Sequence, residues 1–124
     1  MPVIVGVALG GAIGASARYV VDRFVEQRTE SVFPWSIFAV NVSGCLLIGL
    51  ITATLTDREH VPAWARVGLV VGVIGGYTTF STFAQESLDL TEARQIGAML
   101  AYTVGSVAFG MTAVFLGVRL GRLL

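Results

Sequence analysis

Four long runs of the sequence contain no charged residue, and short charged segments separate them. The runs extend from Met1 to Ala17, from Ser31 to Thr56, from Val67 to Gln85 and from Gln95 to Val118. A helix needs about 20 mainly apolar residues to cross the hydrocarbon core of a bilayer. The pattern therefore predicts an all-α integral membrane protein, one domain over residues 1–124, with four transmembrane helices at about residues 3–21, 33–56, 66–86 and 95–119.

Composition supports a membrane protein and removes several kinds of site. The chain is 55% hydrophobic and only 13% charged, with a mean hydropathy of +0.80, which is not the balance of a soluble globular domain. The first run lacks a basic amino-terminal region and three more runs follow it, so a cleaved signal peptide is a poor interpretation. Cys45 is the only cysteine and His60 the only histidine, which excludes an internal disulfide, a cysteine metal cluster and a paired-histidine haem site.

Glycines at every fourth position mark a packing face on the first predicted helix. Gly6, Gly10 and Gly14 lie on one helix face, and small residues at this spacing let two backbones approach closely in a membrane. Arg18 follows at the next step, where we expect it to snorkel to the interface or to point into a water-filled vestibule. The charged stretch Asp57-Arg58-Glu59 is expected to end the second span.

The third run has the least usual composition. Its midpoint is Gly76, so the pair Gly75-Gly76 falls near mid-membrane depth, followed by four hydroxyl side chains and two phenylalanines within Thr78–Phe83. Each glycine lowers helix propensity by about 1 kcal/mol relative to alanine, and unwound carbonyls at this depth must face protein, water or an ion. We therefore expect the third helix to be broken at mid-membrane and this stretch to be the functional centre.

The distribution of arginines gives no preferred orientation. Four arginines fall on the side of the first and third loops and four on the side of the termini and the middle loop, and lysine is absent. Since an excess of Lys and Arg normally keeps one side in the cytoplasm, a chain without that excess is expected to insert both ways up. Two copies in opposite orientations then pair as an antiparallel, dual-topology homodimer.

No acidic residue lies within the uncharged runs, whereas proton-coupled transporters and cation pores generally carry Asp, Glu or His inside the membrane. The runs offer neutral groups instead, which suit an anion better than a cation. Phe80 and Phe83 share a helix face if the helix resumes after Thr78, and their electropositive ring edges are able to line an anion path. Two alternatives stay open: phenylalanines at this spacing are usually core, and Asn41 is more often a helix-packing residue. The neutral polar groups are Asn41, Ser43, Thr78, Thr79, Ser81, Thr82, Tyr102 and Ser106.

Several motifs resemble the Fluc (CrcB) family of fluoride channels. They are Gly10-Gly-Ala-Ile-Gly14 with Arg18, Asn41-Val-Ser-Gly44 with Gly49, and Gly75-Gly-Tyr-Thr-Thr-Phe-Ser-Thr-Phe83 with Glu86. Tyr102 and Ser106 extend the similarity to the fourth run. The block that follows the double glycine is the most specific part, and Tyr77 within it is a bulky departure from the pattern.

The resemblance implies a passive channel that lowers cytoplasmic fluoride, a multi-pass protein of the cell (plasma or inner) membrane with two pores in each antiparallel dimer. It implies a structural, non-transported sodium ion at the dimer centre, held by the main-chain carbonyls of Gly75 and Thr78 from both subunits. The expected partners are a second copy of the chain, fluoride and the lipid bilayer, with no nucleic acid. By position, the residues that resemble the fluoride pore are Phe80 and Phe83 as ring edges, Asn41 as amide donor, Ser81, Thr82, Tyr102 and Ser106 as polar positions, and Arg18 at a vestibule.

Three other classes of function are weighed against a channel. A small dual-topology multidrug exporter is the nearest alternative, but it needs a carboxylate within its first span, and Met1 to Ala17 has none. A structural membrane protein would account for the glycine stripes and leave the hydroxyl cluster unexplained. An enzyme is disfavoured because no nucleophile, base and orienting group converge.

Overall fold

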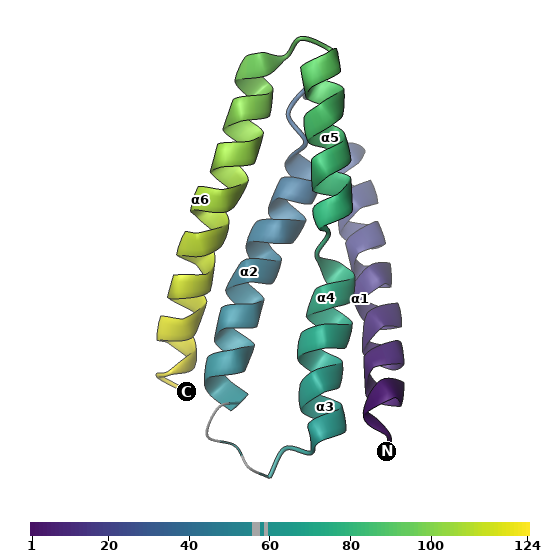
Figure 1. Ribbon diagram of the computed structural model, residues 1–124, viewed down its shortest axis with the longest axis vertical. Coiled ribbons are helices and arrows are strands. Elements are labelled where there is room, and N and C mark those ends of the chain that lie inside the picture. Colours follow the sequence, from purple (N-terminus) through teal and green to yellow (C-terminus); the bar gives the residue numbers. More distant parts are fainter. Residues whose placement is uncertain (56–57, 59) are drawn as a thin grey trace.

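The computed structural model describes residues 1–55, 58 and 60–124, which contain only helices and their connections (Figure 1). Helix α1 spans Val3–Glu26, α2 spans Trp35–Leu55 and α6 spans Ile96–Gly121. The third segment is composite: α3 (Ala63–Val67), the π-helical η1 (Gly68–Ile74), α4 (Gly75–Tyr77) and α5 (Phe80–Glu92).

The four predicted transmembrane helices are confirmed in number and order. Val3–Glu26, Trp35–Leu55, Ala63–Glu92 and Ile96–Gly121 are each long and apolar enough to cross a membrane. Both termini lie at the same end as the connection between α2 and α3, as four spans require (Figure 1). Thr56, Asp57 and Glu59, which include the predicted end of the second span, lie outside the described residues.

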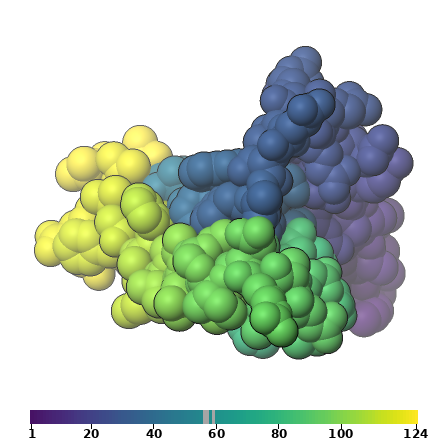
Figure 2. Space-filling model, turned by 90° about the horizontal axis from the view of Figure 1, so that it is seen from above, coloured from purple at the N-terminus to yellow at the C-terminus, as the bar shows by residue number. Residues whose placement is uncertain are grey.

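The first and third spans extend beyond their uncharged runs. Helix α1 continues through Asp22 and Arg23 to Glu26, and α5 continues through Glu86 to Glu92. Charged side chains do not end a helix when they can reach water or a partner, and Arg23 forms an ion pair with Glu26 at 3.2 Å. Seen from this end, the connection from α1 to α2 (dark blue) lies beside the connection from α5 to α6 (green) (Figure 2).

Glycines bring α1 into backbone contact with the third segment, as their spacing predicted. Gly6, Gly10 and Gly14 are the buried residues of α1. A Cβ atom added to Gly10 or Gly14 would overlap the main-chain carbonyl of Gly68 or Val73. Small residues thus permit a close α1–η1 contact where lipid supplies no hydrophobic driving force between helices.

Helices α2 and α6 form the second close pair, also through glycines. A Cβ atom on Gly49 would overlap the Val114 carbonyl, and one on Gly117 would overlap the Leu46 carbonyl. By contrast, Gly97 near the start of α6 has open space at its Cβ position. The bundle therefore has two tightly packed pairs, α1 with α3, η1 and α4, and α2 with α6, which lie side by side in Figure 1, and α5 packs against α6.

The third segment loses its helical conformation at two residues. Helical turns continue through Gly75 and Gly76 to Tyr77, and Thr78 and Thr79 are then extended, with ψ of 160° and 122°. Helix α5 begins at Phe80, with the Thr79 side chain accepting a hydrogen bond from the Thr82 amide at 3.3 Å as its N-cap. The extended pair therefore lies two residues beyond the glycine pair and coincides with the run of hydroxyl residues.

Side chains of a small aromatic cluster fill the bundle near the α5–α6 end. Tyr102 is fully buried with Ile37, and the rings of Phe33 and Phe83 lie 5.5 and 5.1 Å from its ring. Most other large apolar side chains, such as Phe109, are exposed. This distribution is what a protein surrounded by lipid requires, because the apolar surface has acyl chains as its neighbours.

Candidate functional site

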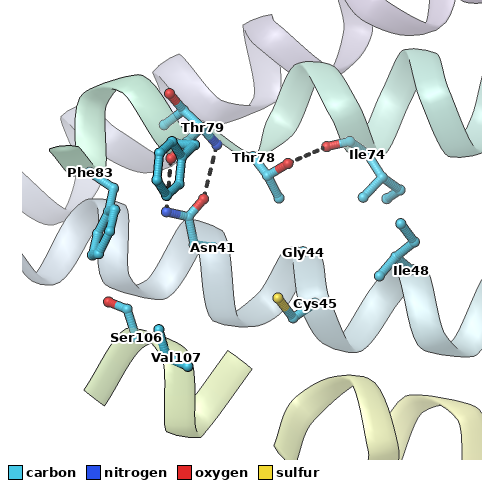
Figure 3. A pocket seen from close by; sticks show the side chains of 11 residues that line it. Asn41, Gly44, Cys45, Ile48, Ile74, Thr78, Thr79, Phe83, Ser106 and Val107 are labelled. Atoms are coloured by element: carbon cyan, nitrogen blue, oxygen red, sulfur yellow. Dashed lines mark hydrogen bonds between the residues drawn. The ribbon is translucent and has the colours of Figure 1, made fainter. Parts of the chain in front are cut away.

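The extended residues are held by an amide side chain from another helix. Asn41, about a third of the way along α2, donates from Nδ2 to the Thr79 carbonyl at 3.0 Å and accepts at Oδ1 from the Thr79 amide at 2.9 Å (Figure 3). Thr79 is buried, so these two bonds satisfy main-chain groups that are largely shielded from solvent. Asn41 therefore joins α2 to the third segment, and its second Nδ2 hydrogen remains outside this pair of bonds.

Arg18 lies beside the same extended residues. Its Nη1 donates to the Thr78 carbonyl at 3.2 Å, while the Thr78 hydroxyl donates to the Ile74 carbonyl at 3.0 Å. The carbonyls at the end of α4 point toward this position and carry partial negative charge. A guanidinium there stabilises the end of the helical segment. Arg18 therefore binds the main chain of the third segment instead of snorkelling to the membrane interface.

A cavity of about 320 Å³ opens next to these contacts, between α2, the third segment and α6 (Figure 3). Most of its wall is apolar, with the Asn41 amide, the Thr78 and Thr79 hydroxyls and the Ser106 hydroxyl as the polar side-chain groups. No carboxylate lines it among the described residues. Its lining is Asn41, Gly44, Cys45, Ile48, Ile74, Thr78, Thr79, Phe80, Phe83, Ser106 and Val107.

Ser106 and the two phenylalanines give the cavity its chemical character. The Ser106 hydroxyl is buried and has no hydrogen-bond partner in the described part of the chain. Phe83 is half-buried, whereas Phe80 is 80% exposed although it lines the cavity mouth. The rings lie 5.7 Å apart with a tilt of 43°. The cavity thus combines an unused hydroxyl and amide hydrogen with aromatic rings.

Four of the eight predicted pore residues do not line this cavity, and one of them is Arg18, which binds the Thr78 carbonyl. The hydroxyls of Ser81 and Thr82 lie 3.3 and 3.1 Å from the Thr79 hydroxyl, within the N-terminal turn of α5. Tyr102 is fully buried in the aromatic cluster and donates to Glu86 Oε2 at 2.6 Å. Ser81 and Thr82 are held by the capping contacts at the start of α5, and Tyr102 is held by the Glu86 carboxylate. Within one protomer, the predicted pore residues that meet at the cavity are Asn41, Phe80, Phe83 and Ser106.

The predicted sodium ligands are the main-chain carbonyls of Gly75, the first residue of α4, and of Thr78, the residue that follows α4. In a continuous helix the Thr79 amide would donate to the Gly75 carbonyl, but it donates to Asn41 instead. Gly75 is exposed and has open space at its Cβ position. The Thr78 carbonyl already accepts from Arg18. A hard cation needs about six oxygen ligands, so these two carbonyls suit a cation only if a second copy supplies more.

Several contacts at the site were not predicted from the sequence. The Ser43 hydroxyl lies 2.9 Å from the Tyr77 hydroxyl and joins α2 to α4, which gives the bulky Tyr77 a structural role. Glu86 accepts the Tyr102 hydrogen bond, whereas it was predicted only as part of a motif and as the end of the third span. The apolar walls at Cys45 and Ile48 follow from the register of α2, which periodicity alone did not define. No group of three His, Cys, Asp or Glu side chains able to hold a metal occurs among the described residues.

Residues 5–118 match the family described as CrcB-like protein, Camphor Resistance (CrcB). The chain belongs to the CrcB family. A CrcB relative from Acidobacterium capsulatum, named fluoride-specific ion channel FluC, is 46% identical over 94% of this chain and 93% of its own. Relatives with the same name from Chloroflexus aurantiacus and Thermus thermophilus are 42% and 44% identical, over 96% and 93% of this chain and 94% and 90% of their own.

Membership in the CrcB family and the four candidate spans both place the protein in a membrane. The match covers nearly the whole chain, so all four long helices belong to the shared CrcB fold. The chain is therefore a multi-pass membrane protein, and the resemblance drawn from its motifs is confirmed.

Proposed function

We propose that this chain is a passive fluoride channel, not an enzyme, and that it lowers the cytoplasmic fluoride concentration. Its relatives named fluoride-specific ion channel FluC support this function over nearly the full length. The observation that carries the proposal is the cavity at Asn41 and Ser106, where neutral donors occur without a carboxylate on the described lining. A buried donor without a partner costs about 1 to 3 kcal/mol, and an anion passing through the cavity relieves that cost.

Neutral donors suit conduction better than a fixed positive charge. Throughput requires binding that is favourable enough to admit the ion and weak enough to release it. The Ser106 hydroxyl and the free hydrogen of the Asn41 amide are able to replace part of the fluoride hydration shell, and the edges of Phe80 and Phe83 add positive potential without a formal charge. The combination favours a small, strongly hydrogen-bonding anion.

The pore is completed by a second copy of the chain. Phe80 is 80% exposed at the cavity mouth, which leaves the ring free to contact another protomer. We place the interruption at Thr78 and Thr79 near mid-membrane, so that two antiparallel copies meet at their extended residues and form two pores. Gly75, exposed and without a side chain, allows the partner to approach the end of α4 closely.

The charge at the two ends of the protomer favours antiparallel pairing. The end with the first and third loops has four arginines against six acidic residues, a formal charge of −2, and the end with the termini and the middle loop has four arginines against two, a formal charge of +2. Antiparallel copies cancel these charges on each membrane face, whereas parallel copies would double them. The six acidic residues are Asp22, Glu26, Glu30, Glu86, Asp89 and Glu92.

A structural sodium ion at the dimer centre would be held by the carbonyls of Gly75 and Thr78 from both copies. These oxygens fit a hard cation in kind, and when bound the ion would supply positive charge at the ends of both α4 helices. Arg18 already supplies part of that charge at the Thr78 carbonyl. The contribution of this chain is thus to keep the carbonyls oriented by the Asn41 and Arg18 bonds.

A small multidrug exporter is the alternative, and the site disfavours it. Cation export in exchange for protons requires a membrane-embedded carboxylate, but α1 has no acidic residue before Asp22, in the last turns of the helix. The cavity lining also lacks a carboxylate among the described residues.

Electrode-monitored efflux from proteoliposomes tests the function directly. The parental chain is expected to release fluoride and to retain chloride. Phe80→Ile and Phe83→Ile are expected to abolish fluoride efflux while the protein still purifies as a dimer, because isoleucine keeps apolar bulk without a ring edge. Undiminished efflux in both variants would remove the ring-edge role.

A fusion reporter tests the orientation. A reporter placed after Leu124 is expected on both faces of the membrane, since the arginine count gives no bias. Its appearance on one face only would exclude the antiparallel dimer.

A further inference from the structure

A second polar group without a partner lies at the opposite end of the third segment from α5. Arg66, in α3, donates from Nη2 to the Arg58 carbonyl at 2.9 Å. Its Nε is buried and has no hydrogen-bond partner among the described residues. A guanidinium is always charged and carries only donors, and a charged donor without an acceptor is costly to bury. Arg66 therefore has a fixed orientation and one donor that lacks an acceptor.

Arg66 also lines a second cavity. The cavity has a volume of about 340 Å³ and is lined by Thr52 and Leu55 of α2 and by Arg66, Val67, Val70 and Val71 of the third segment. Apart from Arg66 and Thr52 its side-chain walls are aliphatic. A half-buried guanidinium beside an apolar cavity of this kind concentrates anions near it.

The two cavities follow one another along the same pair of helices. Six residues of α2 line the two cavities, and they lie on one helix face because successive members are three or four positions apart, except for the adjacent pair Gly44 and Cys45. They are Asn41, Gly44, Cys45 and Ile48 in the first cavity and Thr52 and Leu55 in the second. On the third segment, Val67, Val70, Ile74 and Thr78 keep the same spacing. An anion at Arg66 therefore lies on the same face of α2 and the third segment as the cavity at Asn41 and Ser106.

We propose that Arg66 and the cavity beside it form an anion-docking site at which fluoride arrives before it enters the cavity at Asn41. This inference rests on the proposed function and adds the entry step to it. A monatomic anion accepts from the single free Nε–H. A phosphate of a lipid headgroup is held best by paired donors, and Nη2, next to Nε, already serves Arg58. The position at the rim leaves the guanidinium partly solvated, so the docked ion leaves easily toward the neutral cavity.

Single-channel conductance as a function of fluoride concentration tests the site. Arg66→Gln is compared with Arg58→Gln, which removes the same charge from the same end but has an exposed side chain and keeps its carbonyl. We expect Arg66→Gln to lower the conductance about tenfold at low fluoride and to approach the parental value at high fluoride. Arg58→Gln is expected to change it less than twofold. Equal effects of the two variants would overturn the proposal.

Two further measurements test whether a lipid headgroup occupies the site instead and whether the charge alone is sufficient. Bilayers of phosphatidylcholine alone and with added phosphatidylglycerol are expected to give the same Arg66→Gln effect, and an effect only with the anionic lipid would assign Arg66 to a headgroup instead. If Arg66→Gln does not purify as a dimer, Arg66→Lys replaces it. Because lysine keeps the charge and lacks Nε, an at least threefold loss is expected, and parental conductance would overturn the site.

A binding measurement keeps the docking site distinct from conduction. Fluorine NMR of fluoride with the detergent-solubilised protein is expected to show line broadening in the parental chain and in Arg58→Gln and to lose most of it in Arg66→Gln. Broadening that is unchanged in Arg66→Gln would reject docking. A parental chain that broadens the line but carries no fluoride flux would refute the proposed function while leaving the docking site in place.

Discussion

Replacing Asn41 by leucine tests whether the amide is what allows the third segment to be extended. Leucine is close to asparagine in size, remains a good helix former in α2 and removes both bonds to Thr79. The Thr79 amide and carbonyl are then left without their side-chain partner at a residue that is buried. Because these groups belong to a buried residue, the loss is expected in the stability of the folded protein.

The size of the loss follows from the two bonds, at 2.9 and 3.0 Å. Side-chain hydrogen bonds within membrane proteins average about 0.6 kcal/mol, since unfolded chains in the membrane also find partners. A buried main-chain group left without any partner costs about 1 to 3 kcal/mol. The lower limit for two such groups is therefore about 1.2 kcal/mol and the upper about 6 kcal/mol. We expect about 3 kcal/mol, since Thr79 is extended and has no helical alternative.

Unfolding in mixed micelles with increasing denaturing detergent measures this loss through the fluorescence of Trp35 and Trp64. Thr112→Val is the matched control, because the Thr112 hydroxyl is exposed and donates only to the Ala108 carbonyl of its own helix. The control is expected to change the free energy of unfolding by less than about 0.5 kcal/mol. A loss below about 1 kcal/mol in Asn41→Leu, similar to the control, would mean that the extended residues do not depend on the amide.

Three further variants probe other contacts. Gly14→Ala is expected to destabilise the protein by about 1 to 3 kcal/mol, because the added methyl group forces α1 away from the third segment. Gly97→Ala is the control and is expected to be neutral or slightly stabilising, since the Cβ position of Gly97 has open space. Equal thermal stabilities of the two variants would argue against the close contact. Asn41→Asp is expected to stop fluoride efflux by placing a negative charge in the cavity, and normal efflux would put that side chain off the path. Tyr102→Phe is expected to lower the free energy of unfolding by about 2 kcal/mol, because it leaves the Glu86 carboxylate without its donor. In a Glu86→Leu background the same substitution is expected to cost much less. Additive losses in this double-mutant cycle would show that the two residues are not coupled.

The sequence was a good guide to features that depend on composition and local spacing. Uncharged runs predicted four helices because a span has no other way to satisfy its backbone in lipid. Glycine spacing predicted the contact of α1, since only a missing side chain allows carbonyls of another helix so close. The same rule did not identify Gly117, because its neighbour on α2 depends on how the helices are placed in space.

The site was harder to predict because its contacts join residues far apart in the chain. Glycine propensity drew attention to Gly75-Gly76, but the extended residues are Thr78 and Thr79, where Asn41 compensates the main chain. Tyr102 was expected to face the pore, yet Glu86 one helix away holds its hydroxyl. Neither partner follows from local pattern, because each depends on the rotation of one helix about its axis relative to another.

The Asn41 contact bears on how the protein is made. Asn41 precedes Thr79 by 38 residues, so at ordinary translation rates it leaves the ribosome about 2 to 8 s earlier. By the time the third hydrophobic segment is released into lipid, the second has had time to insert and offer its amide. The main-chain groups of Thr79 can therefore bind the Asn41 amide as soon as the third segment enters the membrane. The order of the two residues in the chain limits the time for which these polar groups are exposed to lipid acyl chains without a partner.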